Sequence, residues 1–84
     1  MLSVNDLNHL NALFGGYQAA NQDTPGSPNY YGFVRNDNAY YIMKETISGN
    51  VSTFAYYKSE TGTYADDWTN RASLTYARYD LVFK

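Results

Sequence analysis

The chain of 84 residues is long enough for one domain and leaves no room for a second. A domain of this size buries only about 60% of its unfolded surface, so its own core gives marginal stability. It has no cysteine, which excludes disulfides and thiolate metal sites, and its one histidine, His9, cannot build a zinc site alone. The net charge of −2 lacks the basic excess of nucleic-acid-binding proteins. No segment is long and apolar enough to cross a membrane, and the first residues do not resemble a signal peptide. We therefore expect a chain that is not exported, and neither nucleic acid nor membrane as a partner.

Residues 1–16 predict a short N-terminal helix. Ser3 and Asp6 have the spacing of a capping box, and Gly15 and Gly16 supply the stop. Apolar side chains recur at helical spacing: Val4, Leu7, Leu10 and Phe14. Because three asparagines weaken the helix, we expect this stripe to pack against another surface, as an arm.

Residues 17–29 are interpreted as a linker between this arm and a β-rich domain of residues 30–84, because prolines and a glycine punctuate the segment and nothing in it is periodic. From Tyr30 to Lys58, runs of β-branched and aromatic residues are separated by the turn segments RNDN and SGN. This pattern predicts three strands of an antiparallel meander.

Three Tyr-Tyr pairs lie in these predicted strands. Adjacent strand residues point to opposite faces, so each pair places one ring on each face. With a two-residue loop at each turn, one face collects Tyr30, Val34, Tyr41, Met43, Phe54 and Tyr56. The other face collects Tyr31, Phe33, Tyr40, Ile42, Ala55 and Tyr57. A three-residue loop would break this partition. Either way both faces are apolar and aromatic, so we expect each to need a cover.

The C-terminal part predicts a short helix followed by a strand. Thr63 and Asp66 have capping-box spacing, and Tyr64 and Trp68 follow at a helical interval. The tail alternates through Leu74, Tyr76, Tyr79, Leu81 and Phe83, with a change of phase near Ala77 or Arg78. This indicates a final strand with a bulge, or two short extended pieces, with continuation of the helix as an alternative. The predicted fold class is α+β: a small antiparallel meander of three to four strands, a short N-terminal helix, and a short helix before the C-terminal strand.

The sequence offers little catalytic chemistry. Asp66 and Asp67 beside Trp68 would suit an acid pair in a sugar cleft, but neighbouring helical residues point in different directions. Acidic residues at the start of a helix are explained by the helix dipole. The segment NDN lacks the spacing of a calcium loop, and no phosphate-binding glycine pattern is present. We expect no enzyme, no cofactor and no metal.

Two segments carry a resemblance to a known group. YYGFVRNDNAYYIMKE and DDWTNRASLTYARYDLVF are similar to small proteins encoded in tailed-bacteriophage genomes. Those proteins pair a YxGxxxxxGxWYIxR-like hairpin with a C-terminal AxxWxxRxxLxYxxFxxxF segment. The matching positions are Tyr30, Gly32, Tyr40, Tyr41, Ile42, Lys44, Trp68, Arg71, Leu74, Tyr76 and Phe83. Asn38 stands where a turn glycine is common, and Tyr40 where tryptophan is common. The resemblance covers residues 30–83 and implies a phage-encoded structural protein of the virion, present in the host cytoplasm during assembly.

We therefore expect a non-enzymatic virion structural or accessory protein, such as a decoration, collar or tail-associated subunit. Its partners would be other virion proteins or copies of itself, in a homo-oligomer. Because tyrosine and tryptophan are preferred anchors of protein contacts, the predicted contact residues are Tyr30, Tyr31, Tyr40, Tyr41, Tyr56, Tyr57 and Trp68. Either face of the sheet could present the contact stripe. Two alternatives are a glycan-binding module that stacks sugars on exposed tyrosines and Trp68, and a small phage inhibitor of a host protein.

Overall fold

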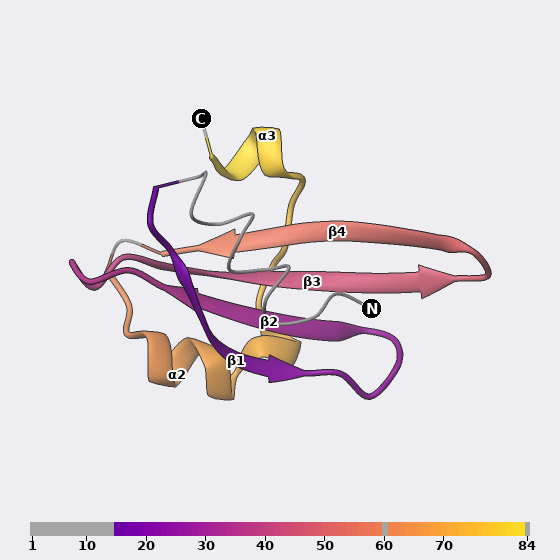
Figure 1. Cartoon of the computed structure of the whole chain (residues 1–84), viewed down its shortest axis with the longest axis horizontal. Coiled ribbons are helices and arrows are strands. Elements are labelled where there is room, and N and C mark those ends of the chain that lie inside the picture. Colours follow the sequence, from indigo (N-terminus) through magenta and orange to yellow (C-terminus); the bar gives the residue numbers. More distant parts are fainter. Residues whose placement is uncertain (1–14, 60, 84) are drawn as a thin grey trace.

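In the computed structural model, residues 15–59 and 61–83 are described, and they form a four-stranded antiparallel sheet with short helices (Figure 1). The strands lie in the sheet in chain order: β1 (Gln18–Asp23), β2 (Asn29–Val34), β3 (Tyr40–Ser48) and β4 (Val51–Lys58). They are followed by α2 (Tyr64–Thr69), the 3₁₀ helix η1 (Arg71–Ser73) and α3 (Tyr79–Val82). The predicted small α+β fold with an antiparallel sheet is confirmed in this form. The predicted N-terminal helix, with Val4, Leu7, Leu10 and Phe14, lies outside the described residues.

The segment 17–29, predicted as a linker, contains a strand. β1 pairs antiparallel with β2 from Gln18 opposite Val34 to Asp23 opposite Tyr30, with an irregularity after Ala19. Its sequence, QAANQD, has no apolar alternation, which is why hydrophobic periodicity did not reveal it. An edge strand needs only one neighbour for its backbone hydrogen bonds, so a polar sequence can hold this place.

The loop between β2 and β3 has three residues rather than two. Arg35 N–H donates to the Ala39 carbonyl at 2.8 Å, and Asn38 N–H donates to the Arg35 carbonyl at 3.1 Å. Asn38 has a φ of 70°, a left-handed conformation that asparagine tolerates better than most residues. A turn closed by one left-handed residue is the common three-residue hairpin loop. Its extra residue shifts the register so that Phe33 lies opposite Tyr41.

The predicted partition of side chains is therefore right for β3 and β4 and inverted for β2, because a one-residue slip exchanges the two faces. β3 and β4 are joined by the two-residue turn Gly49-Asn50, with Ser48 opposite Val51 and Gly49 at a φ of 60°. Face A, as we name it, carries Tyr31, Phe33, Tyr41, Met43, Phe54 and Tyr56. Face B carries Tyr30, Val34, Tyr40, Ile42, Ala55 and Tyr57.

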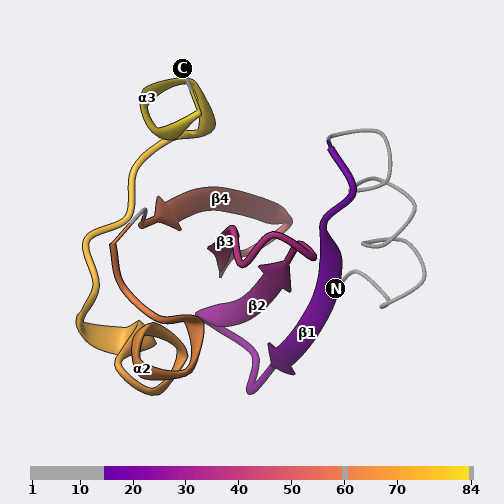
Figure 2. The same ribbon diagram turned by 90° about the vertical axis from the view of Figure 1, so that its left-hand side faces the viewer.

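After β4 the chain passes around the edge of that strand, from face B to face A. Figure 2 shows α2 and α3 on opposite sides of the sheet. Between them, Tyr56 N–H donates to the Ala77 carbonyl at 2.7 Å, and Ala77 N–H donates to the Tyr56 carbonyl at 3.0 Å. This bridge and the helix α3 stand where a final strand was predicted. Tyr79 and Phe83 are four residues apart, and their rings stack with centroids at 4.8 Å, so the phase change near Ala77 marks a switch to helix.

Candidate functional site

The tyrosines predicted as contact residues belong mainly to the core. Tyr30, Tyr31, Tyr40 and Tyr41 are at most 8% exposed within the chain, and their role in a contact stays a prediction. The paired tyrosines of β4, Tyr56 and Tyr57, are half-buried. The physical reason is that the C-terminal segment reaches both faces, so rings on either side of the sheet find partners within the chain.

An aromatic cluster on face A extends from Tyr17, just before β1, to Phe83, just after α3. Its central ring is that of Tyr41, and the rings around it, by centroid distance, are Phe33 at 4.7 Å, Tyr17 at 4.9 Å and Phe83 at 5.1 Å. Tyr17 and Phe83 meet Tyr41 edge to face, an arrangement that adds to the free energy of burying the rings. Segments from both ends of the described chain therefore close over the same face.

On face B, one carboxylate of α2 is bound by two phenols. Tyr40 and Tyr57 both donate hydroxyl hydrogen bonds to Asp67 Oδ2, the latter at 3.2 Å. Burial, and then the bond to Asp67, raises the pKa of Tyr40 to about 12. The neighbouring Asp66 is exposed, whereas Asp67 is half-buried, so the two acids play separate roles. Asp67 fixes α2 on the sheet.

A glycine on β2 lets α2 approach closely. A Cβ at Gly32 would lie 2.0 Å from Tyr64 Oη and 2.8 Å from its Cζ. No side chain fits there, so the glycine is required by the close approach of the ring. Tyr64 Oη in turn donates to Asn21 Oδ1 on β1 at 2.8 Å, and burial raises the pKa of Tyr64 to about 12.

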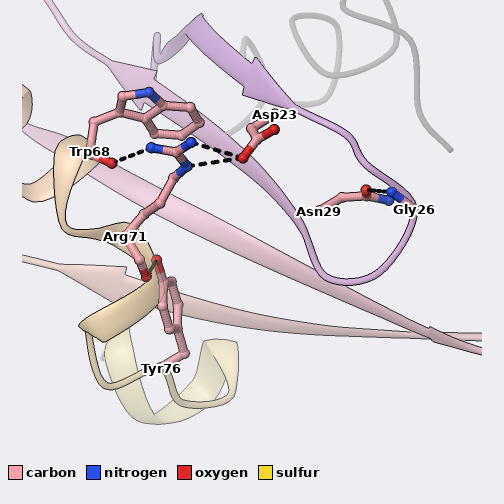
Figure 3. Close-up of polar contacts among 6 residues, drawn as sticks. All are labelled: Asp23, Gly26, Asn29, Trp68, Arg71 and Tyr76. Atoms are coloured by element: carbon pink, nitrogen blue, oxygen red, sulfur yellow. Dashed lines mark hydrogen bonds and ion pairs between the residues drawn. The ribbon is translucent and has the colours of Figure 1, made fainter.

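Arg71 joins the C-terminal segment to β1 (Figure 3). Its Nε and Nη2 donate to Asp23 Oδ2 at 3.2 and 2.8 Å, and its Nη1 donates to the Trp68 carbonyl at 2.8 Å. The Tyr76 hydroxyl donates to the Arg71 carbonyl at 2.9 Å. The guanidinium carbon lies 4.6 Å from the Trp68 ring centroid, and the Tyr64 ring stacks near the indole at 6.1 Å. Trp68, predicted as a contact or sugar-stacking residue, is half-buried and engaged by these neighbours.

A buried carboxylate on β3 was not foreseen from the sequence. Glu45 is 2% exposed, and its Oε1 accepts from the Tyr31 hydroxyl at 2.7 Å and from Asn29 Nδ2 at 3.1 Å. Asn29 also accepts the Gly26 N–H at 2.9 Å, drawn in Figure 3. Burial raises the pKa of Glu45, but hydrogen bonds from Tyr31, Asn29 and Ser52 together keep it below its ordinary value. In the sequence, the only signal for the burial of Glu45 was its position two residues after Met43, on the same face of β3.

Three large apolar side chains stay exposed in the described part of the chain, and they lie on two elements, β4 and α3. They are Val51, 62% exposed, Tyr79, 48% exposed, and Leu81, 55% exposed. Val51 begins β4, and the other two lie on α3, which packs beside β4 and away from β1 (Figure 1). We name Val51, Tyr79 and Leu81 the β4–α3 surface. Val51 lies on face B of β4 and α3 packs against face A, so these side chains flank β4 from both faces. Exposed apolar side chains are one feature of contacts with another protein.

Comparison with known proteins leaves the function to be inferred from this geometry. No protein-family model matches the chain, and neither a curated protein nor a solved structure matches it. Over residues 15–59 and 61–83, no group of three or more acidic or histidine side chains is placed to hold a metal ion. In the same part of the chain, no helix has the length and apolar character needed to span a membrane.

Proposed function

We propose that the protein is a non-enzymatic structural or accessory subunit that acts by binding other proteins. The observation that carries the proposal is the β4–α3 surface, the exposed large apolar side chains of the described residues that flank β4. In contrast, the partly or fully buried carboxylates described above are held by tyrosine hydroxyls, Asp67 by Tyr40 and Glu45 by Tyr31. These two carboxylates hold elements of the fold together through their hydrogen bonds, which favours a binding role for the protein over catalysis.

The resemblance of residues 30–83 to small tailed-phage proteins supplies the biological setting of the proposal. In that setting the chain is a decoration, collar or tail-associated subunit of a virion, and its partners are other virion proteins or copies of itself. A small domain has limited stability of its own, and the high local concentration in a particle adds stability by mass action.

The proposal is tested by the solution mass as a function of concentration, measured by analytical ultracentrifugation. We expect the chain to self-associate as its concentration rises, and we expect the double variant Tyr79→Ser, Leu81→Ser to weaken that association. Ala72→Ser is the matched control, because it changes an exposed apolar residue outside the β4–α3 surface.

A separate measurement tests whether the protein is part of a virion. Mass spectrometry of purified particles, from the phage whose genome encodes the chain, should find it at a fixed ratio to the major structural proteins. A chain that is monomeric at every concentration and absent from particles would contradict the proposal.

A further inference from the structure

The bridge to Ala77 reveals which backbone groups of β4 face the open edge of the sheet. Tyr56 uses both its N–H and its carbonyl there, so these groups point away from β3. β3 and β4 pair without a register shift, and in such a ladder the direction alternates with every residue. Ser52 and Phe54 therefore direct their N–H and carbonyl groups to the same edge. Among residues 15–59 and 61–83, no backbone hydrogen bond reaches these groups.

The two edges of the sheet differ in how they are protected from pairing with another strand. β1 has a register shift between Ala19 and Asn21 and ends on the charged Asp23, and irregularity and charge both disfavour strand addition. The edge of β4 is covered by the C-terminal segment at one end only. The other end, Val51–Phe54, has no charged residue, no proline and no bulge.

We infer that β4 pairs antiparallel with β4 of a second copy of the chain, around a twofold axis at Ser52. Each Ser52 would exchange its N–H and carbonyl with the Ser52 of the other copy. Val51 would lie opposite the second copy's Thr53, and Phe54 opposite the second copy's Asn50. The two sheets would then form one continuous sheet, an isologous contact in which the same patch serves both partners. This inference rests on the proposed function, because it names the partner and the strand that binds it.

The register follows from the space that the C-terminal segment leaves. The antiparallel bridge between Tyr56 and Ala77 places Arg78 beside Ala55, so a partner strand must end at Phe54. With the axis at Ser52, the partner reaches Phe54 with its turn residue and then turns away. A twofold axis at Phe54, the next residue whose N–H and carbonyl face the open edge, would place the partner strand where Arg78 lies.

The chemistry of the edge favours a second copy over a charged partner. Val51–Phe54 is uncharged, so two copies meet without like-charge repulsion. Val51, 62% exposed in the single chain, would pack against Thr53 of the other copy on face B. A single cross-strand side-chain pair adds only a little to the stability of a sheet. The expected dimer is accordingly weak and concentration-dependent.

A single introduced cysteine tests the pairing, because the natural chain contains none. In the proposed register, the two copies of residue 52 form a hydrogen-bonded pair with Cα atoms about 5.5 Å apart, within disulfide range. We expect Ser52→Cys to form a covalent dimer as its major species on mild oxidation. Thr46→Cys, an exposed position on the inner strand β3, is the matched control and should stay monomeric.

Thr53→Cys tests the register itself. In the proposed pairing, the two copies of residue 53 are diagonal neighbours at about 7–8 Å, too far for an unstrained disulfide. Thr53→Cys should therefore cross-link poorly alone and well in a mixture with Val51→Cys. Cross-linking of Thr53→Cys alone, with Ser52→Cys unreactive, would overturn the register.

Ser52→Pro keeps the inference testable without cysteine. It removes an N–H that points away from β3, a position where an edge strand tolerates proline. We expect the variant to keep the far-ultraviolet circular dichroism of the natural chain and to lose its concentration-dependent mass. A failed proposed function shows as no self-association in the natural chain. A failed inference shows instead as association that persists in Ser52→Pro while Ser52→Cys does not cross-link.

Discussion

The guanidinium of Arg71 lies 2.8 Å from the carboxylate of Asp23 and joins segments 48 residues apart in the sequence. The same guanidinium donates to the Trp68 carbonyl and covers the Trp68 ring. One side chain therefore ties the first strand of the sheet to the segment that follows α2. The two side chains of the ion pair are 27% and 39% exposed, so solvent screens part of its strength.

We predict that Arg71→Lys destabilises the fold by roughly 1–2 kcal/mol, because lysine cannot bond Asp23 and the Trp68 carbonyl at once. Urea unfolding measures the loss. Arg78→Lys is the matched control: Arg78 pairs with Asp80 at 3.0 Å with side chains 75% and 65% exposed, so its replacement should cost under about 0.5 kcal/mol. Equal losses for the two variants would contradict a special role of Arg71.

Gly32→Ala should displace α2 from the sheet. The added methyl would overlap the Tyr64 ring, and the expected destabilisation is roughly 1–3 kcal/mol. A double-mutant cycle with Tyr64→Ala provides the control. If the clash is the cause, Gly32→Ala costs much less once the ring is gone, whereas additive losses would point to another cause.

The two phenols that bind Asp67 should contribute unequally. Tyr40 is 3% exposed, whereas Tyr57 is half-buried and donates at 3.2 Å. We expect Tyr40→Phe to cost roughly 1.5–3 kcal/mol, because it removes a buried hydrogen bond to a charged group, and Tyr57→Phe to cost less than about 1 kcal/mol. Thermal unfolding of both variants at neutral pH decides the order, and a larger loss for Tyr57→Phe would refute it.

The fold should unfold in alkali as its tyrosines ionise. The pKa values of Tyr40 and Tyr64 are raised to about 12, mainly by burial, which also raises those of Tyr56 and Tyr76. Unfolded tyrosines ionise near a pKa of about 10, so this contribution to stability is complete below pH 10 and is lost as pH rises toward 12. Phenolate absorbance and circular dichroism should change together over this range. Ionisation of all ten tyrosines near pH 10 without loss of structure would contradict the prediction.

The sequence predicted the strands of the tyrosine-rich region and the position of α2, because their signals are local. Alternating apolar residues and turn residues bracket β2, β3 and β4, and Thr63 does occupy the N-cap position of α2, although its side chain makes no capping hydrogen bond. The one-residue error in β2 came from the loop at 36–38. Two- and three-residue loops share the same residue types, and only the backbone conformation at Asn38 distinguishes them.

What the sequence did not reveal about the candidate site has a different cause. Whether a tyrosine on a two-sided sheet faces solvent depends on what covers it, and the covers here are made by long-range contacts such as Phe83 on Tyr41. β1 was missed because its polar sequence carries no periodicity, and Glu45 because burial of a carboxylate depends on Tyr31 and Asn29 across the strand pair. Such contacts are set by register and tertiary packing, which no local pattern encodes.

The path of residues 61–83 around β4 has a consequence for synthesis of the chain. The four strands emerge from the ribosome before α2 and α3, so the nascent sheet lacks these covers until the later segment is made. Chains meet at high local density on one messenger RNA, and uncovered strands are prone to pair wrongly there. We expect the closing segment to act as an internal chaperone, and ribosome-bound chains halted after Ser59 to be degraded faster by added protease than the released chain of 84 residues.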